Sequence, residues 1–153
     1  MRLVHRTALV PQTPAQMYGL VNDVRRYPEF LPWCPATVVH TEDAQSLAAT
    51  LTFERVGVRT TVTTTNRNVP GESIEMVLTD GPLKSFRGLW QFHPLRARTS
   101  DGSLGEIRGC KVELSIEFTF LNAALDLVFG PFFASTWDSI VDAFVQRARR
   151  VHP

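Results

Sequence analysis

The chain has 153 residues, of which 44% are hydrophobic and 20% are charged. This composition excludes disordered, collagen-like and low-complexity proteins, and the length predicts a single domain over residues 1–153. Sixteen basic residues against fifteen acidic ones leave a net charge of +1. Such a balance gives no overall field that would attract nucleic acid or an anionic membrane, and we expect no DNA partner.

Two features of the sequence indicate a cytoplasmic protein. Cys34 and Cys110 are far apart and form no CxxC motif, which is typical of reduced, packed thiols. The N-terminal segment carries charge early and contains Pro11 and Pro14 before any long apolar run, and no run of ~18 apolar residues occurs elsewhere. We therefore expect neither a signal peptide nor a transmembrane helix, and contact with an inner membrane only at its periphery.

The first predicted elements are a strand and a short helix. Residues 3–10 alternate between two faces, as in a strand. A capping-box pattern from Thr13 to Gln16, with proline at the first helical position, begins a helix that is expected to stop near Arg25. Residues 27–35 then carry three prolines and three aromatic side chains, which predicts a packed segment that is either irregular or a helical turn.

A run of about six strands is expected next. From Thr37 onward the apolar period is two, and Gly, Pro and Asp turn signals separate the stretches of clearest alternation. Residues 97–109 are polar and glycine-rich, which predicts an exposed hairpin loop. The predicted strands with the clearest alternation are residues 47–54, 58–69, 74–78, 86–92 and 110–120.

The last predicted element is a long helix. Asn122 is its expected N-cap, and an apolar stripe continues to Ala148. Over residues 123–150 the helix would be about 42 Å long, at ~1.5 Å per residue, with a kink at Pro131. This order of elements predicts an α+β fold, in which a curved antiparallel sheet wraps around the C-terminal helix and a short helical segment follows the first strand.

Three separated segments resemble one known family. They are Tyr27-Pro-Glu-Phe-Leu-Pro-Trp-Cys34, Gly81-Pro-Leu-Lys-Ser85 with Trp90 and Phe92, and Phe129-Gly-Pro-Phe-Phe133 with residues 141–148. With the order of elements, they are similar to the helix-grip fold of the START-like (polyketide cyclase/dehydrase and lipid transport) superfamily, in the branch of the coenzyme-Q-binding protein and the ribosome association toxin. The resemblance spans nearly the whole chain, and only residues 97–109 look longer than usual, as a surface insertion.

The resemblance implies binding rather than catalysis. Some members of this branch bind ubiquinone and support respiration, whereas others bind the large ribosomal subunit and block subunit joining. Our main hypothesis is a non-enzymatic carrier of ubiquinone or another isoprenoid lipid, in transient contact with a membrane and with no other cofactor. Binding of the large ribosomal subunit is the alternative, and a polyketide aromatase/cyclase is the third reading.

The sequence contains no familiar catalytic or metal-binding motif. The patterns GxSxG, GxGxxG, GxxxxGK[ST], HExxH and CxxC are all absent, and the four histidines have no ligand spacing. We therefore predict no catalytic residue and no metal ligand. A cyclase would need an ionisable group with a shifted pKa inside its pocket, and Glu54 and Arg55 lie on opposite faces of their strand, so only one of them can point inward.

Aromatic and long apolar side chains form the candidate ligand site. A single helix is only about 10–12 Å wide, so a wide curved sheet is not expected to close on it fully, and apolar pockets of ~300–1,000 Å³ hold small hydrophobic molecules. We predict such a pocket, with residues 27–35 as a lid over its mouth, although each side chain taken alone also fits an ordinary core position. The candidate ligand-binding residues are Tyr27, Phe30, Leu31, Trp33, Phe53, Met76, Phe86, Trp90, Phe118, Phe129, Phe132, Phe133 and Trp137.

Two further groups have alternative interpretations. Thr60 and Thr64 would reach a ligand oxygen if they face inward, but we favour ordinary strand threonines with satisfied hydroxyls on a wet face of the sheet. Two sets of arginines are candidate basic patches for RNA, although a C-terminal set more often complements the helix dipole. They are Arg25 with Arg26, and Arg147 with Arg149 and Arg150.

Overall fold

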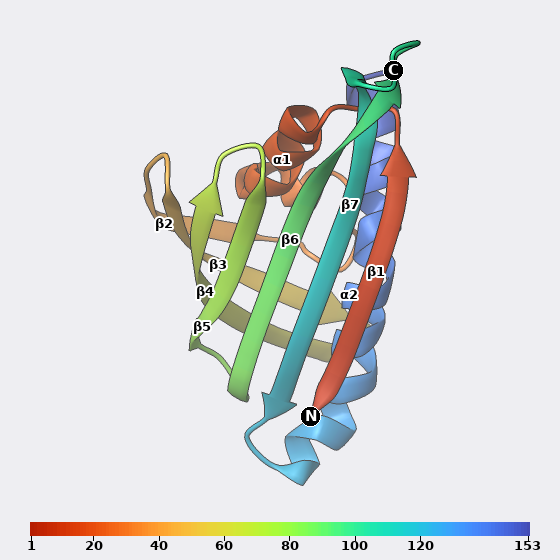
Figure 1. The fold of residues 1–153 in the computed structure, drawn as a ribbon. Coiled ribbons are helices and arrows are strands. Elements are labelled where there is room, and N and C mark those ends of the chain that lie inside the picture. The colour runs from red at the N-terminus through yellow and green to blue at the C-terminus, as the bar shows by residue number, and fades with distance from the viewer.

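Seven antiparallel strands form one curved sheet, in the order β1-β7-β6-β5-β4-β3-β2. The computed structural model describes residues 1–153, and in it the sheet curves around a single long helix (Figure 1). The run of six strands β2 to β7, and with it the predicted helix-grip fold, is confirmed. The strands are β1 (Arg2–Val10), β2 (Thr37–Glu42), β3 (Ser46–Arg55), β4 (Val58–Val69), β5 (Ser73–Asp80), β6 (Leu83–Arg98) and β7 (Leu104–Phe120).

The long helix α2 (Ala123–Val151) begins where the sequence predicts. The Asn122 side chain accepts a hydrogen bond from the backbone N–H of Leu125 at 2.9 Å, which satisfies one of the free donors of the first turn. Pro131 lies inside the helix and does not end it. A Cβ on Gly130 would overlap the Arg2 guanidinium, so the absence of a side chain there lets β1 approach the helix closely.

The N-terminal helical region is divided into two parts. Helix α1 (Pro14–Asn22) has the predicted capping box, in which the Thr13 side chain and the Gln16 side chain each bond the other residue's backbone N–H. The α-helix ends earlier than expected, and a 3₁₀ helix η1 (Val24–Glu29) follows it. Because η1 includes residues 27–29, the first part of the segment 27–35 is the helical turn that was one of its two predicted forms. Pro28 lies within η1, where the proline ring is incompatible with a continuing α-helix.

The prediction of an exposed loop over residues 97–109 is wrong in its extent. Strand β6 continues to Arg98 and β7 begins at Leu104, so only residues 99–103 form the turn. Cross-strand pairing persists as far as Arg98 opposite Leu104. The polar, glycine-rich composition correctly predicted exposure, but it hid the strand because neither face of this ribbon carries an apolar alternation.

The core lies between the concave face of the sheet and α2. It contains 31 buried hydrophobic residues. On β7 the residues from Cys110 to Phe120 alternate as predicted, with every second side chain buried. Phe133 lies at the centre of an aromatic cluster, with ring centroids 4.9 Å from Phe53 and 4.9 Å from Phe118. No helix in the structure is both long enough and apolar enough to cross a bilayer.

Candidate functional site

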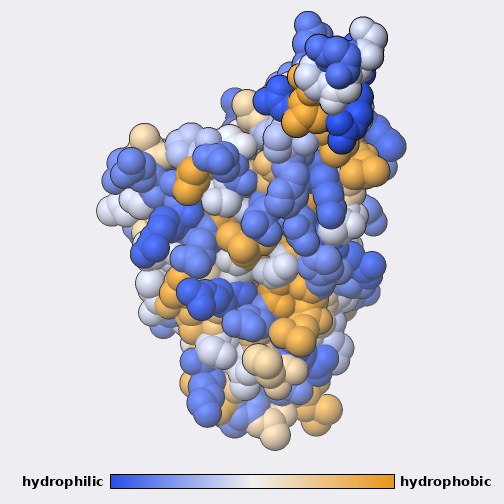
Figure 2. Space-filling view, in the orientation of Figure 1, coloured by the Kyte–Doolittle hydropathy of each residue, from blue (hydrophilic) through white to orange (hydrophobic).

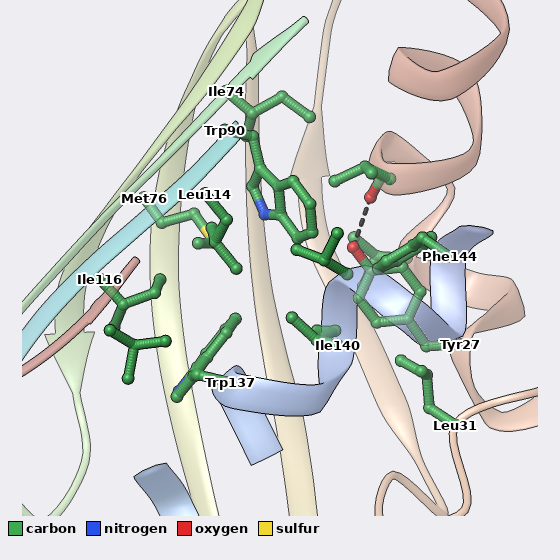
Figure 3. Packing of buried hydrophobic residues seen from close by; sticks show 14 of the residues in the cluster. Tyr27, Leu31, Ile74, Met76, Trp90, Leu114, Ile116, Trp137, Ile140 and Phe144 are labelled. Carbon is green, nitrogen blue, oxygen red and sulfur yellow. Dashed lines mark hydrogen bonds between the residues drawn. The ribbon is translucent and has the colours of Figure 1, made fainter. Parts of the chain in front are cut away.

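An internal cavity lies between the concave face of the sheet and the middle of α2. Its free volume is about 30 Å³, which is room for a water molecule and far below the ~300–1,000 Å³ of typical small-molecule pockets. Figure 3 shows Tyr27, Met76, Trp90, Trp137 and Ile140 converging around it. The full lining is Val24, Tyr27, Ala49, Leu51, Phe53, Val62, Thr64, Asn66, Met76, Phe86, Trp90, Trp137 and Ile140.

One wall of this apolar cavity is polar. The inward face of β4 places Thr64 and Asn66 in the lining, both of them buried. The Thr64 hydroxyl donates to the Asn66 side-chain oxygen at 2.9 Å, which leaves the Asn66 amide nitrogen as a donor at the cavity wall. Thr64 therefore faces inward, contrary to the wet-face reading that we favoured. The same parity along β4, two residues on from Thr64, could have identified Asn66 from the sequence.

The predicted site residues divide between three places. Tyr27, Phe53, Met76, Phe86, Trp90 and Trp137 line the cavity. Trp33 and Phe132 instead line a groove on the outside. The remaining five residues lie away from the cavity. Leu31, Phe118 and Phe133 are buried in the core, and Phe30 and Phe129 are partly buried against it.

The outer groove lies beside the cavity and is much larger. Its volume is about 360 Å³, and it runs between the end of β3 and one face of α2. Trp33 stacks on Phe53 with ring centroids 4.9 Å apart and planes inclined by 15°. Because Trp33 belongs to the groove and Phe53 to the cavity, this aromatic pair forms the wall between the two spaces.

The predicted lid, residues 27–35, is fastened at both ends. The Tyr27 hydroxyl donates to the Val21 carbonyl oxygen, and the Tyr27 ring packs edge-on against Phe144, with centroids 5.5 Å apart. At the other end, the backbone N–H of Glu54 donates to the Trp33 carbonyl oxygen at 2.8 Å. The lid segment is therefore held to the body of the protein at both of its ends.

The cavity wall contains little acid–base chemistry. Tyr27 is its one ionisable side chain, and burial raises the pKa of that hydroxyl far above its usual range. Glu54 and Arg55, the two charged groups considered from the sequence, both lie outside, where Glu54 pairs with Arg59 at 2.8 Å. Cys34 belongs to the predicted lid itself, and burial raises the pKa of its thiol to about 11.

The arginines of the two predicted basic patches do not form two free basic surfaces, because three of the five are paired with acidic side chains. Arg25 pairs with Glu42, and Arg26 pairs with Asp23 and Glu29. Arg147 pairs with Glu29 at 2.9 Å, and only 16% of its side chain is exposed. Of the arginines at the end of α2, Arg149 and Arg150 are therefore the two that remain exposed without an acidic partner.

Comparison with known proteins places these features in a family. Residues 10–145 match the family described as polyketide cyclase/dehydrase and lipid transport. The chain is 41% identical over 152 residues to the ribosome association toxin RatA of Vibrio cholerae, with 99% of each chain covered. It is 26% identical to the mitochondrial coenzyme Q-binding protein COQ10 of Drosophila melanogaster, covering 93% of this chain and 56% of that protein.

A solved structure shares the fold at low sequence identity. The Zhui aromatase/cyclase of Streptomyces superimposes with a TM-score of 0.73 at 16% identity, covering 97% of this chain and 94% of that one. At this identity the likeness concerns the fold alone. The chain belongs to the START-like polyketide cyclase/dehydrase and lipid transport family, in the branch that includes the ribosome association toxins and the coenzyme Q-binding proteins.

Proposed function

We propose that this protein associates with the ribosome, by binding the large subunit and blocking subunit joining. The observation that carries the proposal is the 41% identity, over 99% of both chains, to a protein named as a ribosome association toxin. The interior supports it indirectly, since about 30 Å³ of free space leaves the closed conformation no room for a prenylated ligand. A surface-based function needs no such room.

Sedimentation tests this proposal directly. Purified large and small subunits are mixed with the protein at low salt and separated on a sucrose gradient. We expect the protein to travel with the large subunit and the fraction of joined ribosomes to fall as its concentration rises. If the protein stays at the top of the gradient and joining is unchanged, ribosome association is ruled out for this chain.

Binding of a hydrophobic ligand is the second candidate, and the polar wall of the cavity favours it. An apolar space with an amide donor from Asn66 fits a hydrophobic molecule that carries a carbonyl or hydroxyl oxygen, such as ubiquinone or another isoprenoid lipid. Displacement of the Trp33–Phe53 wall would add the 360 Å³ of the groove to the cavity. Each buried prenyl CH₂ group would then contribute about 0.8 kcal/mol, and exchange would take place at a membrane surface.

Mass spectrometry of organic extracts from the freshly purified protein tests the second candidate, with Trp33→Ala as the comparison. A stoichiometric prenyl lipid that is depleted in the variant supports a carrier. An empty protein that also takes up no added ubiquinone identifies the aromatic side chains as core. We propose no enzymatic step, because Tyr27 is the only ionisable side chain at the cavity wall and its pKa is raised.

A further inference from the structure

The β6–β7 hairpin continues beyond the body of the sheet as a two-stranded ribbon, residues 95–109, which we call the arm. Pairing persists from Leu95 opposite Gly109 to Arg98 opposite Leu104, with a register shift on each side of Arg96 that increases the twist. Figures 1 and 2 show this end of the molecule as a projection that is mostly hydrophilic. Every residue from 96 to 108 except Gly105 is exposed, so the arm contributes nothing to the core.

The arm nevertheless has hydrogen bonds of its own. Arg96 donates to the Gly105 carbonyl oxygen at 3.1 Å, and Arg98 donates to the Gly102 carbonyl oxygen at 2.9 Å. Asp101 accepts from the backbone N–H and the hydroxyl of Ser103, at 3.0 and 2.6 Å, which fixes the turn. Each guanidinium has five N–H donors, so most of them remain available on the surface.

The last turn of α2 lies at the root of the arm. Val10, at the end of β1, pairs with Cys110 of β7, and a Cβ on Gly109 would overlap the Val10 carbonyl oxygen. Two residues later, the Gln12 side chain donates to the His152 carbonyl oxygen at 3.0 Å. These contacts hold the C-terminal end of α2 beside the arm, as Figure 1 also shows for the position of the C-terminus.

Unpaired arginines concentrate at this end of the molecule, although the whole chain carries a net charge of only +1. The other two arginines that lack an acidic partner lie elsewhere, on β3 and β4. The acidic residues of the arm are Asp101, whose carboxylate is engaged in the turn, and Glu106. The five exposed arginines without an acidic partner at this end are Arg96, Arg98, Arg108, Arg149 and Arg150.

We propose that the arm and the last turn of α2 together form a surface that binds the phosphate backbone of structured RNA. The inference rests on the proposed ribosome association and specifies the surface responsible. Guanidinium groups bind phosphates with paired hydrogen bonds, and the arm has no aromatic side chain on which a base could stack. Recognition is therefore by charge and shape rather than by base sequence.

A lipid membrane fits this surface less well. The tip of the arm, residues 99–103, is Thr-Ser-Asp-Gly-Ser, and insertion of such a turn would bury the Asp101 carboxylate in apolar surroundings. The exposed large hydrophobic residues of the arm, Leu104 and Ile107, are separated by Gly105 and Glu106. Binding to the outside of a polyanion such as RNA requires neither burial of the Asp101 carboxylate nor a continuous apolar surface.

The test compares three variants that each remove two positive charges. They are Arg96→Ser/Arg98→Ser on the arm, Arg149→Ser/Arg150→Ser on the helix, and the control Arg59→Ser/Arg67→Ser on β4. Binding of a labelled duplex RNA of ~20 base pairs is followed by fluorescence anisotropy between about 50 and 200 mM salt. The logarithm of affinity should fall with the logarithm of salt concentration, and each of the first two variants should flatten that slope by between about 1 and 2.

The control variant should keep the slope of the unmodified protein, and circular dichroism should show that all three variants are folded. Three outcomes would each overturn the proposal. They are equal slopes in all variants, no RNA binding at low salt, and arm-dependent binding to anionic phosphatidylglycerol vesicles but not to RNA. Ribosome sedimentation separates the two ideas. If the arm variant sediments with the large subunit as well as the unmodified protein does, the proposed function stands and this surface is wrong. If the unmodified protein does not sediment with the large subunit but RNA binding depends on the arm, this surface stands and the proposed ribosome association is wrong.

Discussion

Arg147 joins the predicted lid to the long helix. Its guanidinium carbon lies 4.8 Å from the centroid of the Phe30 ring, and its Nη2 donates to the Glu29 carboxylate at 2.9 Å. The Phe30 ring in turn packs edge-on against Phe144 of α2, with centroids 5.2 Å apart. A residue that we grouped with RNA-binding arginines therefore holds residues 27–35 in place.

Arg147→Ala should lower the free energy of unfolding by about 1–2 kcal/mol, because it removes a partly buried cation–π contact together with an ion pair. Arg150→Ala, three residues further along the same helix, removes an exposed side chain without a partner and should change stability by less than about 0.5 kcal/mol. Urea denaturation measures both. Equal effects in the two variants would contradict a structural role for Arg147.

Phe133 and Trp33 differ as positions for testing ligand binding. Phe133 is 1% exposed and contacts several other aromatic rings in the core, so Phe133→Ala should cost about 3–5 kcal/mol. Trp33 is only partly buried, so Trp33→Ala should lower the free energy of unfolding by clearly less. Thermal unfolding of the two variants checks this order, and a smaller loss of stability for Phe133→Ala than for Trp33→Ala would contradict a central place for Phe133 in the core. Trp33→Ala is consequently the better variant for testing the hydrophobic ligand.

Strand β1 is attached to α2 by two ion pairs that cross from sheet to helix. Arg2 donates to both oxygens of Asp126, at 3.0 and 3.2 Å, and Arg6 donates to Asp138 at 2.8 Å. The hydrogen bond from Arg2 lowers the pKa of Asp126, and that from Arg6 lowers the pKa of Asp138. Both carboxylates are about half exposed, so solvent screens these pairs.

These lowered pKa values predict a loss of stability in acid. A carboxylate with a depressed pKa in the folded state stabilises the fold fully above its unfolded pKa of about 3.9, and the contribution disappears as the pH falls toward the folded value. Thermal unfolding between about pH 6 and pH 2 tests this. The double variant Asp126→Asn/Asp138→Asn should have a lower unfolding temperature at pH 6, and its unfolding temperature should fall less steeply as the pH is lowered.

Glu72→Gln is the control, since Glu72 is exposed and forms no ion pair. Its unfolding temperature should fall with pH as steeply as that of the unmodified protein. If the double variant also falls as steeply, the two ion pairs have no such role.

The sequence predicted elements well where their signals are local. The capping box at Thr13, the N-cap at Asn122 and the alternation of residues 110–120 depend on neighbouring residues, and all three are confirmed. The ends of β6 and β7 were missed because a ribbon that is exposed on both faces has no hydrophobic period to read. Helix α1 was predicted too long: it ends at Asn22, and the 3₁₀ helix η1 that follows buries Val24 and Tyr27.

At the scale of the whole molecule, the sequence shows how many aromatic side chains there are but does not predict how much free space lies between them. The sequence correctly predicted that one helix would lie against a wide curved sheet, and from this we expected a large pocket. Instead, the rings of Phe53 and Phe86 pack at an angle against Trp137 of α2, and Trp90 packs edge-on against Phe144 of the same helix. This packing fills most of the interior and leaves about 30 Å³. Packing of this kind depends on rotamers and on long-range register, which no local pattern encodes.

Opening of the interior can be tested as a shift in the stability of the whole protein. A ligand that binds only the folded state raises the free energy of unfolding by about 2.7 kcal/mol at 100 times its dissociation constant, so a short-chain ubiquinone should raise the urea midpoint if the cavity and the groove can join. Asn66→Leu removes the amide donor at similar volume and should weaken binding about tenfold. Thr79→Val, on an exposed strand position, is the matched control and should respond as the unmodified protein does. Because each variant is compared with and without quinone, its own change in stability cancels. A midpoint that stays fixed in every variant would mean that the interior is only a core, and the function would then depend on the surface.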